Sequence, residues 1–247
     1  MGFAMPMMKD WVPRWIQPWL YVLTALCFQF GGGYYLGALE VIRGTTNFMI
    51  EDVMFLLYAS LAGMAVYFPM LFRMKFRFTN KQLLCASAIV LGICNIVTMY
   101  SQSMPVLVVA CFIAGMAKIQ GTFECMSNIQ LWITPRRDFS VFFPVLHIIL
   151  LTAIEGSGWL AAWFGHHFTW QMMHVFTVGT MSLTLLIQLV CCRPFCPMTH
   201  RLSLKGMDFQ GGLLICVLML TLSYIVVYGD HHMWLDSLHM RVLLGIA

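Results

Sequence analysis

The chain has 247 residues, of which 60% are hydrophobic and 10% charged, and its mean hydropathy is +0.81. Soluble domains are about 45–50% apolar and about 25% charged, so this composition excludes a water-soluble fold. The net charge of +4 comes from 14 basic and 10 acidic residues, and it is too small and too dispersed to indicate nucleic-acid binding. Most of the nine cysteines lie in apolar runs, which indicates small packing residues and not a disulfide framework.

Seven apolar segments are long enough to cross a bilayer, which takes about 20 mainly apolar residues per helix. An eighth segment begins near Arg241, and the sequence stops a few residues later. The first segment is too long for the apolar part of a signal peptide and has no clear cleavage site, so we expect it to remain. The sequence therefore predicts an all-α integral membrane protein, with spans at residues 16–42, 53–72, 82–100, 105–133, 140–164, 170–191 and 210–228.

The basic residues are distributed unevenly among the connections. Only Arg43 and Arg241 lie on one side of the expected helices, and Lys118 lies inside one of them. The positive-inside rule then places the N-terminus and every even-numbered connection in the cytoplasm. The other side carries Lys9, Arg14, Arg73, Lys75, Arg77, Lys81, Arg136, Arg137, Arg193, Arg201 and Lys205.

The connections are short, so we expect function to lie within the helices. The expected organisation is a six-helix bundle at 1–191, a cytoplasmic loop at 192–209, and helix 7 with the start of helix 8 at 210–247. Because the eighth segment is cut short, we expect the chain to be a fragment of a protein about twice as long, or the product of a broken gene.

Three stretches of sequence carry a family resemblance. Residues 156–176 read GSGWLAAWFGHHFTWQMMHVF, which is a glycine-containing helix end, a short loop and an aromatic entry to the next helix. Residues 207–211 read MDFQG, and residues 228–237 read YGDHHMWLDS. With six helices, a basic loop and a seventh helix, these stretches resemble the 14-helix drug:proton antiporter (EmrB/QacA-like) branch of the major facilitator superfamily. The resemblance implies the N-terminal half of that fold and a location in a bacterial cytoplasmic (inner) membrane.

Other stretches depart from the family pattern. Residues 72–81 keep the positive charge of the helix 2–3 loop, but they lack its acidic residue and both glycines. The Gln-Gly of the helix 4 pattern is present at 120–121, whereas its cation is displaced by one residue to Lys118. At 155–156 the chain has Glu-Gly where the antiporters carry a Gly-Pro pair. These departures indicate a divergent branch of the family.

Few ionisable side chains lie inside the expected helices, and each is a candidate site residue because a charge at mid-bilayer costs a few kcal/mol. A rise of about 1.5 Å per residue places Lys118 near the midplane and Glu124 deeper toward the cytoplasm. On the next helix, Glu155 lies near the middle and His147 in the cytoplasmic third. Matching depths predict a buried pair of Lys118 with Glu155. They also predict a pair of Glu124 with His147.

Two roles are possible for these pairs. In the first they form a site that binds protons or substrate, and in the second they only fix the packing of the helices. For the first role we expect Glu155 to carry the proton, Lys118 to be its counter-charge and Glu124 to be a second carboxylate. Gln120 lies beside this group. Gln29 precedes three glycines at mid-membrane, and such an interrupted helix either lines a substrate cavity or packs closely through small residues.

The resemblance and the buried carboxylates predict a secondary active transporter that couples protons to the efflux of hydrophobic or cationic small molecules. Its partners would be that substrate, protons, the lipid bilayer and a periplasmic adaptor protein, and no nucleic acid. The alternative is a non-transporting sensor or partner subunit built on the same fold, or a non-functional truncated transporter. Without a His-Glu-x-x-His, Gly-x-Ser-x-Gly or Walker-type motif, we expect no enzyme activity, cofactor or metal.

Overall fold

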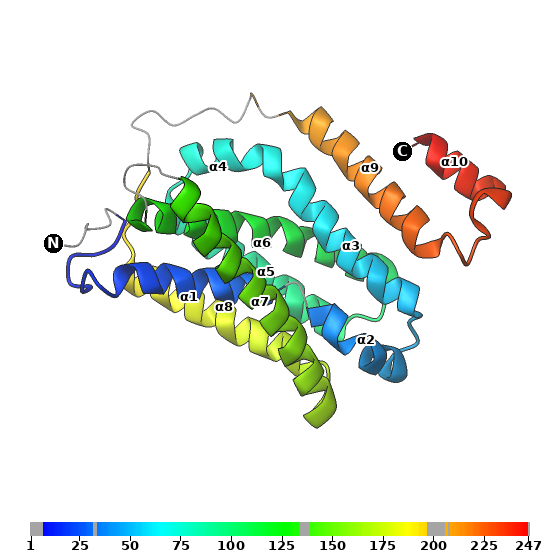
Figure 1. The fold of residues 1–247 in the computed structure, drawn as a ribbon, viewed down its shortest axis with the longest axis horizontal. Helices are drawn as coiled ribbons and strands as arrows, with labels where there is room; N and C mark the ends of the chain where they lie inside the picture. Colours follow the sequence, from blue (N-terminus) through cyan, green and yellow to red (C-terminus); the bar gives the residue numbers. More distant parts are fainter. Residues whose placement is uncertain (1–6, 32–33, 134–138, 197–205, 207, 247) are drawn as a thin grey trace.

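The computed structural model describes residues 7–31, 34–133, 139–196, 206 and 208–246, and these residues form helices without a strand (Figure 1). The only pairing of strand type among them is one antiparallel bridge, between Met8 and Cys192. The main helices are α1 (Gln17–Phe30), α2 (Tyr34–Thr45), α3 (Ile50–Tyr67), α4 (Leu71–Arg77), α5 (Asn80–Tyr100), α6 (Met104–Ile133), α7 (Phe139–His167), α8 (Met172–Cys191), α9 (Phe209–Tyr228) and α10 (Leu238–Ile246).

Six segments of the described chain are long and apolar enough to cross a membrane, as expected of a multi-pass membrane protein. The prediction had seven, and the difference lies in the first expected span, residues 16–42. In the structure α1 ends at Phe30 and α2 begins at Tyr34, so each half is shorter than a span. The six segments are Ile50–Arg77, Asn80–Tyr100, Met104–Trp132, Phe142–His167, Met172–Cys191 and Phe209–Tyr228.

The break between α1 and α2 has a local cause. Gly31 ends α1, and a Cβ at this position would lie 2.7 Å from Leu91 Cδ2 on α5. A side chain at this position would therefore require Leu91 to move. Glycine also weakens a helix by about 1 kcal/mol relative to alanine, which favours an end at this point.

Capping side chains set the starts of other helices. At the start of α5, Thr79 Oγ1 accepts a hydrogen bond from the Gln82 N–H at 3.3 Å, and Gln82 Oε1 accepts one from the Thr79 N–H at 3.1 Å. This reciprocal capping box satisfies two backbone donors that the first turn would leave unpaired. Asp208 caps α9 in a simpler way, because its Oδ1 accepts from the Gly211 N–H at 2.8 Å.

α6 is the central helix, and it packs against α3, α5 and α1 (Figure 1). The contact of α6 with α3 is close because small residues face backbone across it. A Cβ on Gly63 would overlap the carbonyl oxygen of Phe112, and a Cβ on Gly115 would overlap that of Ser60. Such small-residue contacts let helices approach through their backbones. The bundle is thus organised around the α3–α6 pair.

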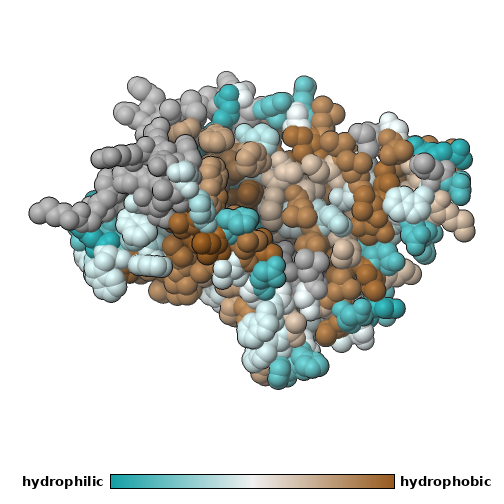
Figure 2. Space-filling model, in the orientation of Figure 1, coloured by the Kyte–Doolittle hydropathy of each residue, from teal (hydrophilic) through white to brown (hydrophobic). Residues whose placement is uncertain are grey.

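The other helices surround this pair. α8 packs on α5, and α7 packs mainly on α2 and α1. α9 lies along α3 on the outside of the bundle, and α10 turns back beside it (Figure 1). Figure 2 shows apolar side chains over much of the visible face, among them regions that belong to these outer helices. Exposed apolar area on this scale is unfavourable in water and is suited to lipid or to another membrane protein.

One end of the bundle is closed by pairing between the N-terminal segment and the residues after α8. The Lys9 N–H donates to the Cys191 carbonyl, and the Arg193 N–H donates to that of Met7, both at 2.9 Å. The Lys81 ammonium donates to two carbonyl oxygens at the end of α8, at 3.2 Å each. Basic side chains from distant parts of the sequence therefore gather at one end, as the charge pattern indicates, while the side of the membrane they face stays a prediction.

Candidate functional site

Polar side chains that are almost fully buried form two stripes along α6. At about 100° per residue, Lys118 and Thr122 share one face of the helix, whereas Gln120, Glu124 and Asn128 share another face about 200° away. Each of the five side chains is at most 6% exposed. A membrane-spanning helix with two buried polar faces needs partners on both sides, and the two faces meet different helices.

The face with Lys118 and Thr122 is directed toward α1. Gln29 Nε2 donates a hydrogen bond to Thr122 Oγ1 at 2.9 Å. The helices are close here, because a Cβ on Gly121 would overlap the Phe28 ring. No hydrogen bond or ion pair joins Lys118 to another described residue, although this side chain is 6% exposed. A buried amine without a partner is costly and is therefore a candidate for ligand or proton binding.

The opposite face carries a salt bridge. Glu124 Oε2 lies 3.7 Å from Lys75 Nζ of α4, and the two side chains are 4% and 17% exposed. The Lys75 ammonium also lies 5.4 Å from the centre of the Phe123 ring, within range of a cation–π contact. The pair joins the end of the α3–α4 segment to the central helix.

One turn away from Glu124 along this face is Gln120. Both atoms of its buried amide lack a hydrogen-bond partner among the described residues. Gln120 lines a hollow of about 230 Å³ between α3, α4, α5 and α6, which we call the Gln120 hollow. Its walls are mostly apolar and include Met74 and Met116, with hydroxyl groups from Tyr67 and Ser87. The hollow can hold an apolar molecule with a hydrogen-bonding group.

The two predicted pairs are wrong. Glu124 binds Lys75 and not His147, and Glu155 and His147 are both exposed on α7. The physical reason is the position of α7, which packs on α1 and α2 and has little contact with α6. The position of a residue along its helix predicts its depth in the membrane, but it does not determine which helices are neighbours. Lys118 is therefore not the counter-charge of Glu155.

A second cluster of buried polar side chains was not predicted from the sequence. His174 Nδ1 of α8 lies 3.1 Å from Asn95 Oδ1 and 3.3 Å from Thr98 Oγ1, both on α5. Asn95 Nδ2 donates to the Leu91 carbonyl at 2.9 Å, so its Oδ1 is left to accept, which assigns the proton of His174 to Nδ1. The spacing of Asn95 and Thr98 on one face of an apolar helix was the signal that could have indicated this group.

The chain is, by its fold, an α-helical membrane protein whose central helix carries buried polar side chains. The Gln120 hollow and the Lys75–Glu124 pair form its candidate site, with Lys118 and Gln29 on the opposite face of α6. No protein-family model matches the chain, and the search of curated proteins found no match either.

Proposed function

We propose that the chain is the N-terminal part of a secondary active transporter of the major facilitator superfamily, which exchanges protons for hydrophobic or cationic small molecules across a bacterial cytoplasmic membrane. The observation that carries the proposal is the burial of Lys118 and Glu124 in the central helix of the bundle. Ionisable residues inside membrane spans are rare and mark substrate, ion or proton pathways. Packing alone would be served better by apolar residues at these positions.

The Lys75–Glu124 pair supplies a contact that protonation can break. When Glu124 binds a proton, it loses the charge that attracts Lys75, and α4 is no longer held to α6 by this pair. A cation in the neighbouring Gln120 hollow would compete with Lys75 for the same carboxylate. Proton and cation binding at Glu124 then exclude each other, which is the property that exchange requires.

Glu155 belongs to a different path in this proposal. It lies near the middle of the Phe142–His167 span and is exposed on the surface of the bundle. A carboxylate at this depth avoids lipid by facing protein or a water-filled cavity. We therefore keep Glu155 as the first candidate for the proton carrier, now without Lys118 as its counter-charge.

The lining of the Gln120 hollow supports the substrate class. Its apolar walls suit a hydrophobic molecule, and the flexible, polarisable side chains of Met74 and Met116 adapt to different shapes. The amide of Gln120 offers a donor and an acceptor without a present partner. In the same bundle, the break between α1 and α2 resembles the discontinuous helices that line transporter cavities.

The test is transport by the purified full-length protein in proteoliposomes with an imposed pH gradient. Ethidium, a hydrophobic cation, is the probe, and an interior pH dye reports proton movement. We expect ethidium to dissipate the gradient, and we expect Glu155→Gln and Glu124→Gln each to slow this exchange at least about tenfold. Glu40→Gln is the matched control, because Glu40 is an exposed carboxylate at the end of the bundle opposite the basic cluster, with a side chain that is 76% exposed.

Unchanged exchange in Glu155→Gln would remove Glu155 from the proton path, and unchanged exchange in Glu124→Gln would do the same for the Lys75–Glu124 pair. An absence of gradient-coupled flux in the unmodified protein would favour the non-transporting sensor or partner subunit.

A further inference from the structure

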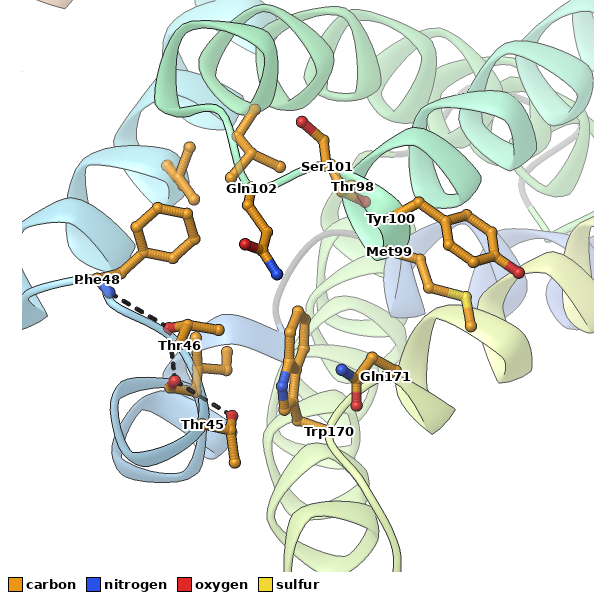
Figure 3. Close-up of a pocket in the computed structure, with 13 residues that line it drawn as sticks. Thr45, Thr46, Phe48, Thr98, Met99, Tyr100, Ser101, Gln102, Trp170 and Gln171 are labelled. Atoms are coloured by element: carbon orange, nitrogen blue, oxygen red, sulfur yellow. Dashed lines mark hydrogen bonds between the residues drawn. The ribbon is translucent and has the colours of Figure 1, made fainter.

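Two adjoining hollows lie at the end of the bundle opposite the basic cluster, where α2 meets α3, α5 meets α6 and α7 meets α8 (Figure 3). Their volumes are about 80 and 130 Å³, and they share Thr45, Thr46, Phe48 and Gln102. Each is several times the roughly 10–15 Å³ that a hollow needs in order to hold one water. We call them the Trp170 hollows, after the residue whose indole ring lines the hollow of about 80 Å³.

The polar lining of the Trp170 hollows is uncharged. No aspartate, glutamate, lysine, arginine or histidine is among the described residues that line them. The polar groups are instead hydroxyls and amides, and Gln102 points its amide toward the Trp170 ring (Figure 3). A charged ligand would lose its hydration here without an opposite charge in return, so the lining selects neutral ligands.

Trp170 supplies a donor that the fold leaves without an acceptor. The residue is 8% exposed, and no described residue accepts a hydrogen bond from its buried Nε1–H. A buried donor without a partner costs about 1–3 kcal/mol, which an oxygen atom of a ligand would recover. The flat apolar ring next to this donor also offers a surface for an apolar ligand face.

The hydroxyls on the opposite wall are acceptors. Thr45 Oγ1 donates to the Val41 carbonyl at 2.8 Å and Thr46 Oγ1 donates to that of Ile42 at 2.6 Å, so each hydroxyl has used its only proton. The Thr46 oxygen also accepts from the Phe48 N–H at 3.5 Å, so one of its two lone pairs is left for a ligand donor. No described donor uses the Thr45 lone pairs, and Trp170 can donate to a ligand acceptor. Ligand hydroxyl groups both donate and accept, and so they match both walls.

A rigid support lies behind the Trp170 ring. The ring contacts the His174 imidazole edge to face, with centroids 5.4 Å apart, and His174 is held in turn by Asn95 and Thr98. Thr98 also lines the hollow. The indole is thus fixed by buried contacts, as recognition of a small ligand requires.

We propose that the Trp170 hollows bind a small uncharged solute that carries several hydroxyl groups, a sugar or polyol. The charge pattern predicts that this end of the bundle faces the outside of the cell. The site is separate from the Gln120 hollow, and its binding needs neither a proton gradient nor the transport activity proposed above.

The test is equilibrium dialysis of the full-length protein in phosphatidylcholine nanodiscs against radiolabelled D-glucose and, separately, myo-inositol. We expect saturable binding of at least one of them. Glucosamine and glucuronate, which resemble glucose in size but carry opposite charges, should compete at least about tenfold more weakly. A glycolipid headgroup presents the same hydroxyls, so a second set of nanodiscs contains monoglucosyl diacylglycerol. Loss of free-sugar binding in that set identifies the lipid as the source, and retained binding identifies the free sugar.

Two variants assign the binding to these residues. Trp170→Phe keeps a ring and removes the Nε1–H, and we expect it to weaken binding about five- to tenfold. Gln102→Leu alters an exposed residue and should weaken binding without affecting folding. Trp163→Phe on α7 is the matched control and should bind as the unmodified protein does. The proposal is overturned if neither sugar binds saturably and the glycolipid is not retained, if both charged analogues compete as well as glucose, or if both variants bind normally.

Discussion

Helices α6 and α7 follow each other in the chain and are nearly equal in length, at 30 and 29 residues. Both contain a long apolar span with ionisable residues at similar depths. The fold separates them, because 56% of the α6 span is buried inside the bundle and only 17% of the α7 span. Lys118 and Glu124 are consequently enclosed by protein, whereas Glu155 faces outward. Two helices of similar length thus differ in their charged residues. Those of α6 are buried against other helices, whereas Glu155 of α7 is exposed.

The difference comes from the neighbours of each helix. α6 contacts α1, α3, α4 and α5, and the part of it that carries Lys118 and Glu124 is enclosed by protein. α7 contacts mainly α1 and α2, and the rest of its surface is left to the surroundings. A charge on α6 must find a partner inside the chain or bind a ligand, while a charge on α7 depends on what lies against the bundle.

The largest contrast is expected between removal of Lys75 and removal of the Glu155 charge. Lys75→Met leaves Glu124 buried without its counter-charge, which should lower the free energy of unfolding by about 3 kcal/mol. Glu155→Gln removes an exposed group and should change it by less than about 0.5 kcal/mol. Unfolding titrations with SDS in mixed micelles measure both values. Similar losses in the two variants would show that α6 and α7 do not differ in this way.

A second contrast uses glycines on the two helices. Gly115→Ala on α6 forces a Cβ against the Ser60 carbonyl, and overpacking of this kind costs about 1–3 kcal/mol. Gly158→Ala on α7 meets open space and should be neutral or stabilising, since alanine favours helix by about 1 kcal/mol. Thermal unfolding of the detergent-solubilised protein compares them. A Gly115→Ala protein as stable as the unmodified one would contradict the close α3–α6 contact.

Threonines give a smaller contrast. Thr122→Val on α6 removes the acceptor of the Gln29 amide and should cost about 1 kcal/mol. Thr152→Val on α7 is its control, since Thr152 is exposed and should tolerate the change within about 0.5 kcal/mol. The same SDS titration applies. Equal effects at both positions would mean that the α1–α6 hydrogen bond adds nothing to stability.

A different kind of contrast concerns the end of the bundle that the N-terminal segment closes, where Cys192 can be compared with the partly exposed Cys196. Burial raises the pKa of the Cys192 thiol to about 11. Because the thiolate reacts, its alkylation by iodoacetamide should speed up about tenfold per pH unit between pH 7 and 10. The linked stabilisation is complete below the ordinary thiol pKa, near 8.5, and is lost as the pH rises through 11. Peptide mass spectrometry follows each cysteine, and alkylation of Cys192 at pH 7 as fast as Cys196 would contradict its burial.

The helical character, the positions of the long spans and the basic end could be predicted from the sequence. Apolar run length decides whether a segment can cross a bilayer, and this property is local. The glycines after Gln29 likewise indicated a weak point in the first span, and the structure divides that span at Gly31. The site was predicted less well. Lys75 lies in a segment that the sequence predicts to be a connection between helices, and Asn95 and His174 were not among the predicted polar residues.

Composition and periodicity by themselves determined that the chain is a helical membrane protein with few, expensive ionisable groups inside its spans, because each of these properties depends on one segment at a time. The tertiary structure alone decided that Glu124 pairs with Lys75, that Lys118 has no described partner, and that Glu155 lies outside the bundle. Those outcomes depend on which helices are neighbours and how each is rotated, and the free energy that selects them comes from packing between segments that are distant in the sequence.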